Sequence, residues 1–334
     1  MKTVFAFVPA PGHIYPGHPE NPERLRLFEP PESAEQVKAT PARLEEVSRV
    51  HTPQMILDVE AACKQGPAII DFAPTFVTRS SFEDALLAAG AGLACTRLVL
   101  HGEAKNAFAV LRPPGHHAEP KRAMGFCLFN NIAIAAREAL AQGLERVLIV
   151  DYDAHHGNGT QAVFWDDQRV AYLSTHQEGI YPGSGWIAEA PQARQRIVNL
   201  PLPPRTGDQG YLRLAETVIR PLAEVFRPQL ILVSAGFDAH WNDPLTQLGL
   251  SSAGFFTLSK FLVDLAGEHC NGKIVFLLEG GYRPENVANG AAAVFAALEG
   301  ANSAPQVEDA SPYPEPDVSQ RLAEVCRWQG WETA

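Results

Sequence analysis

The chain has 334 residues, 46% of them hydrophobic, and a formal net charge of −11, which together allow a large buried core. The negative charge excludes sequence-independent binding of nucleic acid, which needs a basic surface, and suits a cationic substrate. No stretch reaches the ~18 uninterrupted apolar residues of a membrane span. The five cysteines are scattered and form no Cys-x-x-Cys pair, so we expect reduced thiols and a cytoplasmic protein.

Short apolar runs alternate along the chain with stretches of helical periodicity. We expect strands at residues 2–8, 106–112, 146–152, 170–175, 229–235 and 273–279. We expect helices at residues 83–101, 129–143, 208–226, 254–269 and 285–299. This alternation is typical of right-handed βαβ units, and it predicts an α/β fold in which helices cover both faces of a mainly parallel sheet.

The segments between these elements have distinct compositions. Residues 10–31 and 177–206 are rich in proline and glycine, and we expect both to be long surface loops that shape the mouth of a site. Because no repeat or clear linker divides the chain, we expect residues 1–334 to form a single domain. The Pro-rich stretch 303–317 and the segment 320–331 would then pack on its body.

Metal-type ligands follow two of the expected strands. Asp153 and His155 come directly after one of them and point to the same side, because alternate residues of a strand share a face. Asp238 follows another strand end. Two carboxylates and one imidazole leave coordination positions open, which is typical of a catalytic metal ion. A lone Asp-x-His would more often line a polar loop, but polar groups at several strand ends favour the metal site.

A histidine pair follows the strand at 106–112. Two prolines and a glycine precede His116 and His117 and form a rigid turn that aims both side chains. A neutral histidine can take a proton from water and return it to a leaving amine. We therefore interpret the pair as catalytic, although an isolated His-His is more often a polar surface turn.

Three further features have alternative interpretations. Asp151 could orient His116, bind a monovalent cation or cap a helix. Tyr282 could donate a hydrogen bond to a developing oxyanion, or simply pack on the rim of the sheet. Gly280 and Gly281, which precede it, allow close approach of a substrate.

The combined motifs resemble those of the histone deacetylase superfamily, which includes acetylpolyamine amidohydrolases. The resemblance covers about residues 13–300 and rests on six motifs, which are Arg112–His117, Gly125–Asn131, Asp151–Thr160, Tyr181–Gly183, Gly236–Asp238 and Glu279–Tyr282. The form of the motif Asp151–Thr160 is similar to that of class II members. The resemblance implies a single-domain arginase–deacetylase fold with an eight-stranded sheet.

The resemblance also implies roles for these residues. One Zn²⁺, for which Fe²⁺ can substitute, would be held by Asp153, His155 and Asp238. The catalytic residues would be His116, His117 and Tyr282. The substrate tunnel would be formed by Phe126, Tyr181, Leu245, Gly125, Gly280 and Gly281. The substrate would be an acetylated lysine peptide or an acetylated small amine, with neither nucleic acid nor membrane as a partner and with a homo-oligomer left open.

Structural potassium is implied as well. A first K⁺ would lie near Asp151, with Asp153, His155, Ser174 and Thr175. A second would lie in the turn that contains Phe164, Asp167 and Val170. Asp151 and Asn158 would lie next to the catalytic histidines and orient them, without contacting the substrate.

Two positions carry mechanistic detail. Asn158 stands where class I members have an aspartate, and a neutral partner would not raise the pKa of His117 as a carboxylate would. We therefore expect a neutral His117. Leu245 stands where polyamine-specific members can carry a glutamate, which argues against that route to polyamine selectivity.

Three rival functions remain. A binuclear ureohydrolase of the arginase type would need acidic ligands where this chain has Gly157 and His240. A non-enzymatic acyl-group binder is disfavoured because every expected ligand and catalytic group is present. A different acyl substrate, such as an acetylated polyamine, stays open because the loops at 10–31 and 177–206 decide what lies outside the tunnel.

Overall fold

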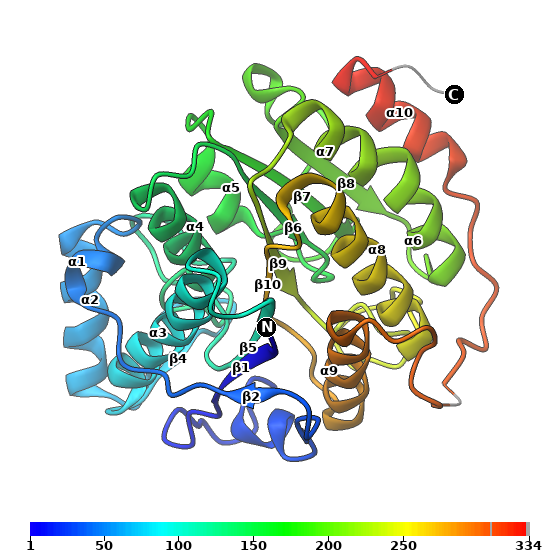
Figure 1. Ribbon diagram of the computed structural model, residues 1–334. Coiled ribbons are helices and arrows are strands. Elements are labelled where there is room, and N and C mark those ends of the chain that lie inside the picture. The colour runs from blue at the N-terminus through cyan, green and yellow to red at the C-terminus, as the bar shows by residue number, and fades with distance from the viewer. Residues whose placement is uncertain (308, 332–334) are drawn as a thin grey trace.

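An eight-stranded sheet runs through the middle of the molecule, in the order β2-β1-β5-β10-β9-β6-β7-β8 (Figure 1). Every neighbouring pair is parallel, which confirms the predicted α/β fold. The computed structural model describes residues 1–307 and 309–331. The strands of the sheet are β1 (Thr3–Val8), β2 (Glu35–Gln36), β5 (Asn106–Leu111), β6 (Val147–Asp151), β7 (Val170–Gln177), β8 (Ile197–Leu202), β9 (Leu230–Ala235) and β10 (Ile274–Leu278).

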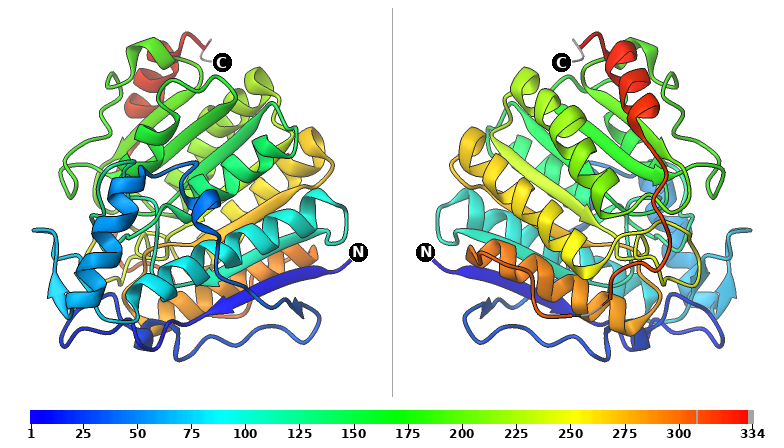
Figure 2. Two further views of the ribbon diagram at one scale, coloured as in Figure 1. Left: turned by 90° about the vertical axis from the view of Figure 1, so that its left-hand side faces the viewer. Right: turned by 90° about the vertical axis from the view of Figure 1, so that its right-hand side faces the viewer.

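Helices lie on both faces of this sheet. The helices are α1 (Leu44–Val47), α2 (Pro53–Gln65), α3 (Ser81–Leu100), α4 (Asn131–Ala141), α5 (Asn158–Phe164), α6 (Asp208–Leu214), α7 (Arg220–Phe226), α8 (Ser252–Cys270), α9 (Pro284–Glu299) and α10 (Ser319–Gln329). The views from the two sides show α3 and α4 over one face and α8 and α9 over the other (Figure 2). In the described part of the chain, no helix has both the length and the apolar character needed to cross a bilayer.

Alternate residues of the strands feed two hydrophobic cores. In β5, Phe108 and Val110 pack into the core under α8 and α9, whereas Ala107, Ala109 and Leu111 pack into the core under α3 and α4. This is the two-residue period of a strand that is buried on both faces. The continuous apolar runs that predicted the strands arise from this burial.

The prediction of residues 177–206 as a loop was wrong in part, because β8 lies within it. Asn199 and Pro201 interrupt its apolar run, and proline is tolerated there because β8 is an edge strand. The two-residue β2 was also not predicted, nor was the small hairpin of β3 (Ala68–Ile69) and β4 (Phe76–Val77). Helices α2 and α5 were missed, although Thr52 caps α2 directly before Pro53.

The C-terminal part of the chain lies along the outside of the domain. Asp309 accepts hydrogen bonds from the backbone N–H of Ser252 and from His240 Nε2, and Glu315 accepts from three backbone N–H groups at the start of α6. Helix α10 then packs against β8. The predicted helix at 208–226 is present as α6, one π-helical turn (Ala215–Ile219) and α7.

Candidate metal centre and catalytic residues

The polar motifs follow five strands that are consecutive neighbours in the sheet, β5-β10-β9-β6-β7. Because all five are parallel, their carboxyl ends meet at one edge, where sites of α/β proteins form. The turn after β5 carries the two histidines, the turn after β10 carries Tyr282, and the turns after β9 and β6 carry the acidic residues. The topology therefore brings together residues that are up to 166 positions apart, from 116 to 282.

Asp153, His155 and Asp238 converge at this edge. One ligand atom from each lies within 4.8 Å of the others, and within the described residues no other group of three or more His, Cys, Asp and Glu residues does so. Nδ1 of His155 is 3.1 Å from Oδ1 of Asp153 and 2.9 Å from Oδ2 of Asp238. Both carboxylates are also fixed from behind, since Gly280 N–H donates to Asp153 at 2.7 Å and Ala154 N–H to Asp238 at 2.9 Å.

These residues fit a single divalent cation. The two carboxylates lie close together in a buried site, and burial, and next the charge of Asp153, raise the pKa of Asp238 to about 6. Two carboxylate oxygens and one imidazole nitrogen are a ligand set that zinc uses at catalytic sites. The two positions where a second ion would need acidic ligands hold Gly157, which has no side chain, and His240, which is engaged with Asp309.

His116 is held in a negatively charged pocket. Its Nδ1 lies 3.1 Å from Oδ2 of Asp151, and the hydroxyl of Tyr172 donates to the same oxygen at 3.0 Å. Burial alone would lower its pKa, but the carboxylates of Asp153 and Asp151 raise the pKa of His116 to about 10. Glu279 accepts from the backbone N–H of His116 at 3.1 Å and so fixes the turn. Of the alternatives for Asp151, the helix cap is wrong, because this residue ends β6.

His117 has a different environment. Its Nδ1 is 2.8 Å from Oδ1 of Asn158, whose amide nitrogen donates to Oε1 of Glu119 at 2.9 Å. Since Asn158 donates to Glu119, its oxygen faces His117 as an acceptor, which places the proton on Nδ1 and leaves Nε2 free. Burial, and next the charge of His116, hold the pKa of His117 well below its usual value. This supports the expected neutral imidazole.

Glu119 was not singled out from the sequence. It stands two residues after His117, but a glutamate in a loop is most often a solvated surface residue. Its side chain is about one-third exposed, at 32%, and Arg122 lies 3.4 Å away. Only the fold shows that Asn158, 39 residues further along the chain, reaches it.

A cavity of about 240 Å³ opens beside the triad. Its lining residues are Ala73, Pro74, His117, Gly125, Phe126, His155, Tyr181, Leu245 and Tyr282. The wall is mainly apolar, because Ala73, Pro74, Phe126, Leu245 and the rings of the two tyrosines form most of it. Gly280 and Gly281, which we expected along the tunnel, are not among the lining residues. Gly280 lies behind the triad, and the carbonyl of Gly281 accepts from Arg24.

Gly125 has no room for a side chain. Its φ of +57° lies in the left-handed region, and a Cβ atom there would lie 2.5 Å from Cδ2 of His117. The next residue, Phe126, is also left-handed, with φ of 67°. This backbone turns the Phe126 ring towards Tyr282, with the ring centroids 5.9 Å apart. Gly125 thus contributes close packing against His117.

The residues of the first implied potassium site lie together. Asp151 and Ser174 are paired in the sheet, and the hydroxyl of Thr175 lies 3.5 Å from the carbonyl of Asp151. Asp153 and His155 follow within the same turn. The oxygen-rich end of β6 and β7 therefore suits a monovalent cation.

The residues of the second implied potassium site contact an arginine. The carbonyl oxygens of Phe164 and Val170 both accept hydrogen bonds from Nη1 of Arg196, at 2.7 and 3.0 Å. The N–H of Val170 donates to the carbonyl of Asp167 at 3.2 Å. A guanidinium group thus contacts two of the carbonyls that the resemblance assigns to the ion.

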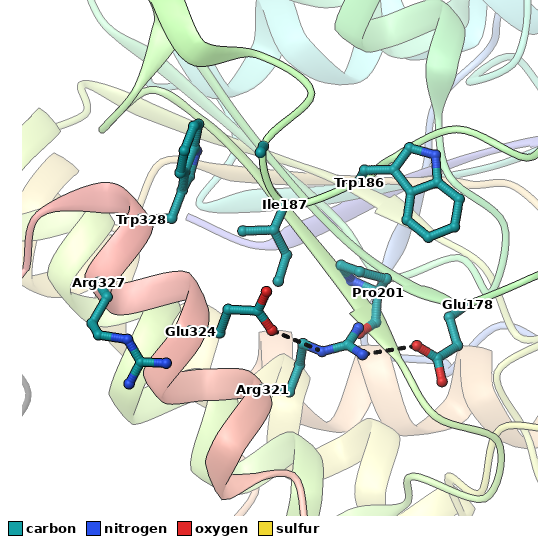
Figure 3. Close-up of a pocket in the computed structure, with 9 residues that line it drawn as sticks. Glu178, Trp186, Ile187, Pro201, Arg321, Glu324, Arg327 and Trp328 are labelled. Carbon is teal, nitrogen blue, oxygen red and sulfur yellow. Dashed lines mark hydrogen bonds and ion pairs between the residues drawn. The ribbon is translucent and has the colours of Figure 1, made fainter.

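A larger cavity, of about 620 Å³, lies between α10 and the loop that follows β7 (Figure 3). Trp186 and Trp328 stand on its walls. Arg321 in its centre is paired with Glu178 at 2.9 Å and with Glu324 at 3.7 Å. It contains none of the residues predicted for catalysis.

Comparison with known proteins gives a consistent result. A family model described as the histone deacetylase domain matches residues 18–298. The chain is 43% identical over 282 residues to a probable deacetylase of Archaeoglobus fulgidus, covering 81% of this chain and 78% of that protein. It is 38% identical over 317 residues to the histone deacetylase-like amidohydrolase of Pseudomonas aeruginosa, covering 89% and 82%. The crystal structure of the HDA15 HD domain matches with a TM-score of 0.86 and 33% identity, covering 98% and 94%.

Proposed function

Because this chain belongs to the histone deacetylase family, we propose that it is a zinc-dependent amidohydrolase that acts on acetyl-lysine or a related acetylated amine. The products would be acetate and the free amine. One observation carries the proposal: His155, a member of the triad, lines the same apolar cavity as His117 and Tyr282. The cavity thus offers ligands, a base and a hydrogen-bond donor to one bound amide.

We assign the metal to Asp153, His155 and Asp238. A zinc ion there would polarise the acetyl carbonyl and lower the pKa of a water molecule. The oxygen-rich ends of β6 and β7 would hold one structural K⁺. The five cysteines are free thiols, which suits a reducing compartment such as the cytosol.

The chain's own groups would then move the protons. Burial lowers the pKa of His117, so as a neutral imidazole with a free Nε2 lone pair it would accept the proton of the attacking water and pass it to the leaving amine. Burial, and next the charge of Asp238, hold the pKa of Tyr282 well above its usual value. Tyr282 therefore stays protonated and would donate a hydrogen bond to the carbonyl oxygen. Phe126 and Tyr181 would enclose the aliphatic stem of the substrate.

We expect acetyl-lysine peptides to be better substrates than acetylspermidine or acetylputrescine. A polyamine carries a further ammonium group beyond the acetamide, and no carboxylate is among the residues that line the cavity. Desolvating that charge without a partner is costly. The test is a parallel measurement of kcat/KM with the zinc-loaded protein, and a higher value for either polyamine would assign the chain to the alternative substrate class. A free acetate yield of zero with every substrate would contradict the proposed activity itself.

The substitution Asn158→Asp is expected to move the acid limb of the kcat/KM pH profile upward. A carboxylate 2.8 Å from Nδ1 would stabilise the protonated form of His117 and so raise its pKa, and the base would become available only at higher pH. The charge of His116, which lowers this pKa, is unchanged in the variant.

Because Glu119 faces position 158, the new carboxylate would also meet a like charge. The double variant Asn158→Asp with Glu119→Gln removes that repulsion and is the matched comparison. An acid limb that stays in place in both variants would show that His117 does not set it.

A further inference from the structure

The guanidinium of Arg196 is a buried cation whose partners are main-chain carbonyl groups. The residue is only 5% exposed. Nη1 donates to the carbonyls of Phe164 and Val170 at 2.7 and 3.0 Å, and Nη2 donates to that of Trp165 at 2.6 Å. Among the described residues no carboxylate lies within ion-pair distance of it. A buried charge normally requires a paired countercharge, so this arrangement needs an explanation.

The three carbonyl groups form a cradle for a monovalent cation. Phe164 is the last residue of α5 and Trp165 is its C-cap, so their carbonyls have no partner within the helix. Val170 begins β7, on the other side of the turn. Rings of carbonyl oxygens that replace a hydration shell are how proteins bind K⁺. Here the planar fork of an arginine meets the same oxygens, each through an N–H group.

The backbone of Arg196 is held in place by hydrogen bonds to neighbouring elements. Arg196 precedes β8, its N–H donates to the carbonyl of Ala193, and its carbonyl accepts from the N–H of Tyr172 in β7. Helix α5 and strands β7 and β8 lie side by side in Figure 1. The side chain therefore ties the end of α5 to the adjoining strands, and it cannot diffuse away as an ion can.

Two further arginines make a second cation at this turn unfavourable. Arg137 donates to the carbonyl of Val163 at 3.2 Å and is paired with Asp167. Arg169 is paired with the same carboxylate at 2.8 Å. The charge of Asp167 is thus already shared by two guanidinium groups before any ion is added.

We infer that Arg196 takes the place of a bound monovalent cation at the α5–β7 turn, so that this turn binds no K⁺ and keeps its structure whatever the K⁺ concentration. The inference does not depend on the proposed activity, because it concerns a turn outside the cavity. Any K⁺ dependence of the wild-type protein would then arise at the ends of β6 and β7.

The direct test is Rb⁺ as a heavy analogue of K⁺. We expect crystals of the wild-type protein soaked in RbCl to show no anomalous peak among the carbonyls of Phe164, Trp165 and Val170. Crystals of Arg196→Ala should show one. A peak at this turn in the wild-type protein, with the Arg196 side chain displaced, would overturn the inference.

Thermal unfolding provides a second readout that does not need crystals of the variant. We expect Arg196→Ala to unfold a few degrees below the wild-type Tm in LiCl and to regain part of this difference in KCl at the same ionic strength. Arg196→Lys, which keeps the charge, should show a smaller K⁺ effect. Equal Tm values of Arg196→Ala in the two salts, with no Rb⁺ peak, would show that the carbonyls are no cation cradle and would equally overturn the inference.

The matched control is Arg169→Ala. This variant removes one positive charge from the same turn, but Arg169 is 53% exposed and its side chain contacts Asp167 rather than the carbonyls. Its Tm should respond to KCl and LiCl as that of the wild-type protein does. A K⁺-specific response in this control as large as that of Arg196→Ala would assign the effect to net charge and contradict a role for the cradle.

Discussion

Replacement of Tyr282 by phenylalanine is expected to lower kcat by roughly 10²–10³-fold, the usual cost of losing one hydrogen-bond donor to a developing oxyanion. The zinc content should stay at the wild-type level, because Tyr282 is not part of the triad. KM should change little, since the ring that contacts the substrate is retained.

The structure makes this substitution selective for the hydroxyl group. The backbone N–H of Tyr282 donates to Asp243 at 2.9 Å, and this contact does not involve the side chain. Arg24 lies over the ring at 5.1 Å from its centroid, a contact that phenylalanine preserves. The removed atom is therefore the one to which the proposal gives a chemical role.

The measurements are steady-state kinetics and the zinc content per chain. Tyr313→Phe is the matched control, because Tyr313 is half-exposed, at 49%, and lies away from the cavity. Wild-type turnover by Tyr282→Phe would refute the role of the phenol. Loss of zinc in this variant would instead indicate that the triad had been disturbed.

The substitution Asp153→Ala is expected to remove zinc and activity together. It deletes one of three ligands, and Asp238 and His155 alone leave the ion with too few protein donors. The same side chain also accepts from the N–H groups of Gly280 and His155, at 2.7 and 2.9 Å. The alanine variant therefore also leaves two backbone donors without their partner.

A companion variant separates these two effects. Asp153→Asn keeps an oxygen acceptor for the backbone while removing the charge, so it should unfold at a temperature closer to that of the wild-type protein and still bind zinc poorly. Asp264→Ala, at an exposed carboxylate on α8, is the control and should retain one zinc per chain. Full zinc content in both Asp153 variants would exclude this residue as a ligand.

The repeating part of the fold could be predicted from the sequence, because each central strand is an apolar run buried on both faces. Strands β5, β6, β9 and β10 lie within one residue of the predicted bounds at each end. Strand β8 could not be found in this way, since Asn199 and Pro201 break its run. The amide nitrogen of Asn199 finds its partner only through tertiary contact, donating to Gln161 at 2.8 Å.

The site was predictable to the extent that its groups sit directly after strands. Asp153 and His155 share a strand end, so their proximity follows from the two-residue period. Their approach to Asp238 required the sheet order, which no local pattern contains. Glu119 and Arg196 were missed for the same reason: each acts through a partner that only the folded chain brings within reach.

Strand β1 lies outside the segment that matches the family model, residues 18–298, yet it pairs with β5 from Thr3↔Asn106 to Val8↔Leu111. Arg112, at the end of β5, also donates to the carbonyl of Pro9 at 2.7 Å. An engineer who shortened the chain to the matched segment would turn β5 into an uncovered edge, whose free N–H and C=O groups invite strands from other molecules. Such a truncated protein would be prone to aggregate rather than to yield a smaller enzyme.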